Sequence, residues 1–235
     1  DGNGGTSGSQ NATFGNGEKV TFNAAKKPGH TFKNWNTKTD GTGKSYPDGV
    51  SIDKIDASNG STVTLYPIYR PNVLTFHFYA NGADNYRSTP DEKTHTVTAD
   101  EKSNRTEIAL TQNVECMKYD ADVNTYGIVD SQRLSKTGYT STNKWHANSV
   151  SGVLLDANNG VYAKTQDLAQ AAGILNDLEN GDVDLNLYAD WTAIKYKIVF
   201  NANNGEGNMA PLELSYDTSG NLPQNTFTRS KHRFI

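Results

Sequence analysis

The chain has 235 residues, of which 34% are hydrophobic and 10% aromatic, and its formal net charge at pH 7 is -4. This length is sufficient for two or three small domains, and the mean hydropathy of -0.70 indicates that each has a small core and a polar surface. The slightly acidic balance, with no basic run, argues against a nucleic-acid-binding protein, because that function needs clustered Lys and Arg to neutralise phosphates.

Cysteine content and apolar runs constrain the compartment. Cys116 is the one cysteine of the chain, so no disulfide can form within it. The longest apolar runs are far shorter than the roughly 20 residues that span a bilayer, and we expect no membrane insertion. No signal peptide is present, but the sequence begins inside a predicted unit, so its absence says nothing about export.

The first unit reads as short strands separated by turns. Residues 1–5, Asp-Gly-Asn-Gly-Gly, are typical of a turn, and we expect the strand before it to lie upstream of Asp1. The remaining predicted elements follow in chain order: a strand at 19–22, a turn at 27–29, a strand at 30–35, a polar hairpin loop at 40–44, a short helix within 51–57 and a closing strand at 63–69.

The second unit follows the same plan with added length. Residues 74–78 alternate as a strand does, and Ala80-Asn81-Gly82 is the turn after it. An insertion lies roughly between Asp84 and Asp130. Residues 166–178 carry Leu and Ala at helical spacing behind Thr165, which predicts one helix with a threonine cap.

A third unit starts at 196–201, an alternating strand followed by the turn Asn203-Asn204-Gly205. The segments between units, 70–72 and 192–195, are short and contain no Gly/Ser linker. Closely coupled units of this kind tend to be held semi-rigidly.

Two phrases recur in order along the chain. Gly29-His-Thr-Phe-Lys-Asn-Trp35 is followed by Leu65-Tyr-Pro-Ile-Tyr69, and the phrase from Gly138 to Trp145 is followed by Leu187-Tyr-Ala-Asp-Trp191. Repetition on this scale predicts an array of similar small domains. We place the first repeat at 1–71, the second at 72–193 with its insertion at about 84–130, and the start of a third at 194–235.

These phrases resemble the Listeria–Bacteroides repeat family, the B-repeats of internalin-type bacterial surface proteins. The pattern of that family is an Asn-Gly-Gly turn, Gly-Tyr-x-Phe-x-x-Trp, a Gly-rich loop and Leu-Tyr-Ala-x-Trp. The chain departs from it at His30, Pro67, Tyr69 and Ser141, and has one residue inserted before Trp145. The resemblance implies a mostly β (α+β) fold of tandem ubiquitin-like (β-grasp) modules. It also implies export and no catalytic residues, cofactor or metal.

Several local patterns have a functional and a structural interpretation. Residues 41–45, Gly-Thr-Gly-Lys-Ser, resemble the end of a P-loop, but Lys38 stands where that motif needs Gly, so a hairpin loop is favoured. Asp120, Asp122 and Asn124 imitate the start of a calcium loop without its later Gly and Glu, which favours a polar turn over a calcium site. Cys116 is interpreted as a small buried thiol rather than a reactive one.

Histidines and tryptophans were the other candidates for a site. The five histidines show no paired ligand spacing. An approach of His77 to His95 in the insertion is the one pairing considered, and exposed polar positions are favoured over it. Trp35, Trp145 and Trp191 recur within the repeat, which favours core anchors over sugar-stacking platforms. We expect Trp35 and Trp191 to be largely buried.

The function predicted from these observations is a non-catalytic repeat region of a bacterial cell-surface protein, wall-attached or secreted. It would act as a stalk or spacer and as an adhesion or protein-interaction module for a host or neighbouring-cell protein or glycan. The alternative is an accessory carbohydrate-binding module of a secreted glycoside-degrading enzyme. An incomplete first repeat also predicts head-to-tail association of copies, with strand 196–201 of one docking on the first repeat of the next.

Overall fold

The computed structural model describes residues 9–20, 26–58, 60–110, 116–123, 131–156 and 162–234. The chain is mostly β, as the sequence predicts. It forms two compact units, the first made of 1–77, 113–127 and 161–185, the second of 78–112, 128–160 and 186–235. Strands β4 (Val73–Tyr79) and β11 (Val183–Ala193) each contribute residues to both units.

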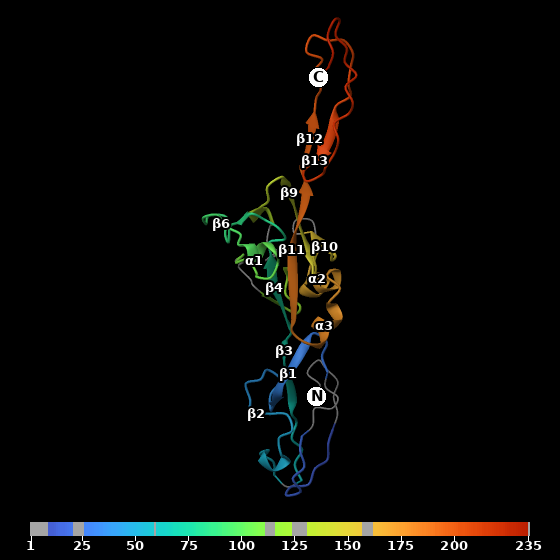
Figure 1. The fold of residues 1–235 in the computed structure, drawn as a ribbon. Coiled ribbons are helices and arrows are strands. Elements are labelled where there is room, and N and C mark those ends of the chain that lie inside the picture. The colour runs from blue at the N-terminus through green and yellow to red at the C-terminus, as the bar shows by residue number, and fades with distance from the viewer. Residues whose placement is uncertain are drawn as a thin grey trace. The chain divides into compact units, whose positions relative to one another are not determined.

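Among the described residues, most of the strands are short and pair antiparallel with their neighbours (Figure 1). The other strands that the structure describes are β1 (His30–Asn36), β2 (Ser45–Tyr46), β3 (Tyr66–Pro71), β5 (Asn85–Tyr86), β6 (His95–Thr96), β7 (Cys116–Lys118), β8 (Leu134–Ser135), β9 (Tyr139–Ala147), β10 (Leu154–Asp156), β12 (Lys195–Ile198) and β13 (Leu212–Ser215). Within the sheets, the strand orders are β2-β1-β3, β10-β9-β11-β4-β7, β12-β13 and β6-β5-β8. The helices are α1 (Ala99–Lys102), α2 (Thr165–Ala171), α3 (Leu175–Asn180) and the 3-10 turns η1 (Ile52–Lys54) and η3 (Ser131–Arg133).

In the first compact unit, β1 and β3 correspond to the strands predicted at 30–35 and 63–69, although β3 begins at Tyr66, and they pair antiparallel. A small core of Tyr46, Val50 and Ile55 lies beside them, and Trp35 packs against it while remaining half-buried. The predicted helix within 51–57 is the single turn η1. Of the strand predicted at 19–22, Lys19 forms a bridge to Ser51, and residues 21–25 lie outside the described part of the chain.

The single helix predicted at 166–178 is wrong. The segment forms two helices, because Gly173 takes the left-handed conformation, with φ +74, and ends the run after α2. Thr165 does not cap the helix either: its hydroxyl donates to the carbonyl of Lys118 at 2.7 Å, and Lys164 occupies the cap position. Leu168 and Leu178 are fully buried, so the predicted apolar face is correct.

In the second compact unit, β9 pairs with β10 and β11 around a deeper core. Trp145 is completely buried and meets Phe78 edge-on, with ring centroids 5.2 Å apart. Leu187 and Ala189 of β11 are also fully buried. Aromatic edge-to-face contacts add about 0.5–1.5 kcal/mol to the burial of area alone, so Trp145 is the anchor of this core.

The residue inserted before Trp145 is taken up by a β-bulge. Between Phe32 and Asn34, β1 advances by two residues while its partner β3 advances by one. Between Ser141 and Trp145, β9 advances by four residues while its partner β11 advances by two. The bulge of β9 therefore contains one more extra residue than the bulge of β1. Asn143 sits in this bulge with φ +59, and its side-chain oxygen accepts the backbone N–H of Ser131 at 3.0 Å.

The predicted insertion at about 84–130 contains two kinds of structure, a strand of the main sheet and a separate group of short elements. β7 pairs with β4 in register Leu74↔Met117 and completes the opening hairpin of the second repeat, as β13 does with β12 in the third. Residues before it form β5, β6 and α1, and they bury Val97, Ile108 and Leu110. Residues 84–110 of the insertion are therefore part of the core of the second compact unit.

The prediction of a buried Cys116 is also wrong. Cys116 opens β7 and is exposed, while the next residue, Met117, is 2% exposed. Strand alternation places neighbouring side chains on opposite faces, and the pairing of β7 with β4 turns Met117 inward. The sequence alone does not indicate which of these two neighbouring apolar residues faces the core.

Candidate functional site

The junction between the first and second repeats is closed by a hydrogen-bond relay in the first compact unit. The carbonyl of Gly29, the first residue of the repeated phrase, accepts the N–H of Asn72 at 2.8 Å. The carbonyl of Asn72 in turn accepts the N–H of Tyr119 at 2.8 Å. The ring of Tyr119 lies where any side chain at position 29 would stand. Gly29 has φ +70, so the position favours glycine on two independent grounds.

The junction between the second and third repeats, in the second compact unit, repeats this arrangement. The carbonyl of Gly138 accepts the N–H of Ile194 at 2.9 Å, and the carbonyl of Ile194 accepts the N–H of Tyr216 at 2.9 Å. The ring of Tyr216 fills the space beside Gly138, which has φ +78. The repeated phrase therefore begins at a docking position for a tyrosine of the next repeat.

Each docking tyrosine meets a second ring and is followed by a turn. Tyr119 packs edge-on against His30, and Tyr216 against Tyr139, with centroids 5.7 Å apart in both pairs. Asp120 and Asp217 follow with φ of 65 and 58. This Tyr-Asp pair at the end of the opening hairpin is a second recurring signal.

The Asp of each pair accepts a hydrogen bond within its own junction. The carboxylate of Asp120 accepts from the side-chain amide of Gln166 at 2.6 Å. The carboxylate of Asp217 accepts from the Tyr139 hydroxyl at 3.0 Å, and this bond raises the pKa of Tyr139. The turns are thus held by side chains as well as by the backbone.

The first junction has further polar fastenings. The side chain of Asn72 is fully buried; its amide donates to the carbonyl of Leu178 at 2.7 Å and its oxygen accepts from the Thr31 hydroxyl at 2.6 Å. Arg70 binds Asp182 through two nitrogen–oxygen contacts of 2.8 Å. This bidentate partner, together with the N–H of Val73, holds the pKa of Asp182 below its ordinary value.

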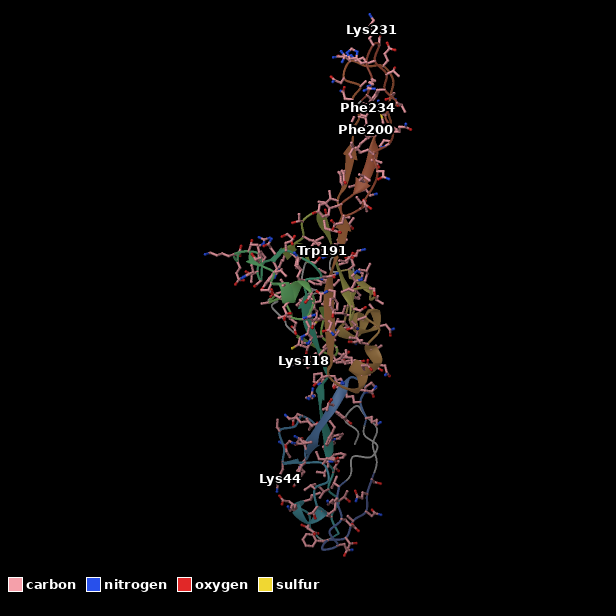
Figure 2. All side chains as sticks on the ribbon, in the orientation of Figure 1. Lys44, Lys118, Trp191, Phe200, Lys231 and Phe234 are labelled. Atoms are coloured by element: carbon pink, nitrogen blue, oxygen red, sulfur yellow. The ribbon has the colours of Figure 1, made fainter. Side chains whose placement is uncertain are left out.

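A hollow of about 330 Å³ adjoins the second junction. The ammonium nitrogen of Lys136 lies 4.2 Å from the ring centroid of Tyr139 and 5.9 Å from that of Trp191. The indole N–H of Trp191, which Figure 2 labels on β11, donates to the carbonyl of Asn81 at 2.9 Å. The hollow is lined by Leu134, Ser135, Lys136, Tyr139, Thr140, Ser141 and Trp191.

A hollow of about 310 Å³ occupies the corresponding place in the first repeat. Lys27, His30 and Tyr69 stand there at the phrase positions of Lys136, Tyr139 and Trp191. The ammonium of Lys27 lies 6.0 Å from the centroid of Tyr69. A lysine beside the last aromatic residue of the closing strand is therefore common to both repeats.

The tryptophans divide between core and surface. The core-anchor interpretation holds for Trp145, but the expectation that Trp35 and Trp191 are largely buried is wrong, since both are half-buried. Trp191 stands where β11 leaves the core, so one side of its ring faces the hollow.

The motif-like patterns have structural partners. Residues 41–44 lie in the hairpin loop between β1 and β2, and Ser45 begins β2. The ammonium of Lys44 pairs with Asp56 at 2.6 Å. Asp122 pairs with Lys164 at 2.8 Å, and Asn124 lies outside the described residues. Where the structure is described, no group of three or more His, Cys, Asp or Glu side chains is placed to hold a metal ion.

The histidines considered as ligands contact other groups. His77 lies 3.1 Å from Asp184, and His95 stacks on Tyr86 at 5.1 Å. His146 is half-buried between the carboxylate of Asp190 and the carbonyl of Gly152, each 3.0 Å away. Among the described residues, no helix is both long enough and apolar enough to cross a membrane.

Comparison with known families confirms the resemblance for the first repeat. Residues 1–66 match the family model of the Listeria-Bacteroides repeat domain. Domains of this family are typical of bacterial surface or secreted proteins. No curated protein and no solved structure matches the chain.

Proposed function

We propose that this chain is a non-catalytic repeat region of a bacterial cell-surface protein, in which it serves as a stalk or spacer and carries adhesive contacts. The family match at residues 1–66 supports the surface assignment. The observation that carries the spacer role is the recurrence of one junction: Gly29–Asn72–Tyr119 and Gly138–Ile194–Tyr216 form the same relay. A spacer needs each repeat to be held by the next, and this relay does so without a flexible linker.

The pairing of β4 with β11 supports the β-grasp architecture as part of this proposal. β4, the first strand of the second repeat, lies beside β11, its last strand. Tyr79 stacks on Tyr188 at 4.7 Å, and the side chain of Asn81 donates to the carbonyl of Ala189. Contacts advance in the same direction along both strands, so first and last strands run parallel at the centre of the sheet, as in a β-grasp fold.

An accessory carbohydrate-binding module of a secreted enzyme is the second candidate. The half-buried ring of Trp191 in a hollow with Lys136 favours it, because aromatic faces of this kind bind sugars. The two candidates differ in what the parent protein contains: a cell-wall anchoring sequence supports the surface stalk, and an attached glycosidase domain supports the module.

Surface exposure on the native bacterium tests the proposal. Antibodies raised against residues 1–235 should label intact cells or cell-wall fractions, and protease applied to intact cells should remove the signal. A gene variant lacking the repeats should place the remaining parts of the protein closer to the wall, lowering their access to large antibodies. Labelling of permeabilised cells alone would contradict the proposal.

A further inference from the structure

The hollow of the second repeat combines a cation with two aromatic faces. Lys136 forms no ion pair among the described residues, and its ammonium lies 4.2 Å from the ring centroid of Tyr139 and 5.9 Å from that of Trp191. Ser135 and Thr140, both exposed, add hydroxyl groups at the rim. The hydroxyl of Ser141 already bonds with that of Ser131 at 2.8 Å and accepts the N–H of Asn143 at 3.1 Å. A concave site with apolar walls and a few convergent polar groups is the usual form of a small-ligand site.

The walls of this hollow are held in place by Asn81, in the turn after β4, and by Asp84, at the start of the insertion. The carboxylate of Asp84 accepts the N–H of Thr137 at 2.7 Å, beside Lys136, and pairs with Lys102. These two partners hold the pKa of Asp84 well below its usual range, so its charge is retained at any physiological pH. The backbone of Asn81 fixes Trp191 through its indole N–H. The lysine and the indole are thus preorganised by residues that do not line the hollow.

We propose that this hollow binds an acidic saccharide. The apolar face of the sugar ring stacks on Trp191, its carboxylate binds the ammonium of Lys136, and its hydroxyls bond with Ser135 and Thr140. The proposal deepens the adhesive part of the proposed function and rests on it for its biological setting. An ammonium in a half-buried site attracts an anion, because a hydrogen bond between charged partners is stronger there than one between neutral groups.

The hollow of the first repeat also combines a lysine with an aromatic ring. Tyr69 and Lys27 take the places of Trp191 and Lys136, although Glu179 also lines this hollow. We therefore expect weaker binding there, because a carboxylate on the wall repels an acidic sugar. The chain thus has two hollows of related composition, one in each compact unit.

The test is a titration of the chain 1–235, followed by NMR, with four probes: sialyllactose, an oligogalacturonate, neutral lactose and short polyglutamate. The acidic saccharides should shift the indole resonance of Trp191 and bind at least about tenfold more tightly than lactose, a factor that corresponds to about 1.4 kcal/mol. Lys136→Gln should weaken binding about tenfold or more. Lys144→Gln, which removes the same charge from β9 outside the hollow, should leave binding unchanged.

Trp191→Phe separates stacking from folding. It retains an aromatic face while losing the bond to Asn81, so it should weaken binding with amide spectra otherwise intact. Absence of binding by both acidic saccharides would overturn the proposal, as would binding that Lys136→Gln does not change. Equal binding of polyglutamate would show that the site takes an acidic peptide instead. Each of these results leaves the surface and spacer roles untouched, because those are measured on cells and across the junctions.

Discussion

The ring of Tyr119 occupies the space that a side chain at Gly29 would need. These two residues are distant in sequence and belong to successive repeats, so their contact ties one repeat to the next. Tyr216 and Gly138 form the same pair at the following junction.

Gly29→Ala should destabilise the first compact unit more than a positive φ alone explains. Alanine at a left-handed position costs roughly 1–2 kcal/mol, and the collision with Tyr119 should add about 1–3 kcal/mol. Gly49→Ala is the matched control, because Gly49 has φ +65 and nothing within 4 Å of its added Cβ. Chemical denaturation gives the free energy of unfolding of both variants. Equal losses of that free energy in the two variants would show that the ring of Tyr119 is not closely packed against Gly29.

Asp182→Asn tests the ion pair at the first junction. Because the folded-state pKa of Asp182 is depressed by Arg70, the pair stabilises the protein above the unfolded pKa of about 3.9, and this is lost as pH falls through the folded value. The half-exposed pair should contribute about 0.5–1 kcal/mol at pH 7 after screening. The variant should therefore lose stability at pH 7 and match the wild type near pH 2. Asp91→Asn, at an exposed turn, should show neither effect.

The three tryptophans should differ in what their removal costs. Trp145→Ala should destabilise by about 3–5 kcal/mol, because it leaves a large cavity in a closed core. Trp35→Ala and Trp191→Ala should cost less, since both rings are half-buried. Thermal unfolding of the three variants gives the order, and equal losses for Trp145 and Trp191 would contradict the division into core and surface.

Removing the insertion should damage its own unit. Replacing residues 84–110 by a short Asn-Gly turn removes Ile108, which is 3% exposed and bonds through its N–H to the carbonyl of Phe78. It also exposes Leu134, which is 4% exposed in the intact structure. We expect dispersed NMR signals to be lost from the second compact unit but retained for β1 and β3. Unchanged stability would mean that the insertion is a separable surface loop.

The repeated phrases predicted the strands well because their alternation and turns are local properties. β1 and β9 begin beside the expected glycines, and the residue inserted before Trp145 appears as a larger bulge. The break at Gly173 was harder to foresee, since glycine within a helix costs only about 1 kcal/mol and is often tolerated. Its left-handed φ depends on how the two short helices pack.

The junction itself was missed, although a signal was present. Tyr119-Asp120 and Tyr216-Asp217 each end an opening hairpin, but the insertion of the second repeat hides their equivalence. Asn72 gave no signal, because a buried asparagine in a short connection looks like any polar linker residue. Its role depends on Thr31 and Leu178, which only the folded chain brings to it.

The central claim is that the Tyr-over-Gly junction holds successive repeats in a fixed relation. A distance measurement between spin labels at Thr42 in the first repeat and Asn176 in the second, in a Cys116→Ser background, tests it within the first compact unit. We predict one narrow distance distribution, broadened by Tyr119→Ala and unchanged by the control Tyr66→Ala. A broad distribution in the unmutated junction, or one that Tyr119→Ala leaves narrow, would contradict the claim.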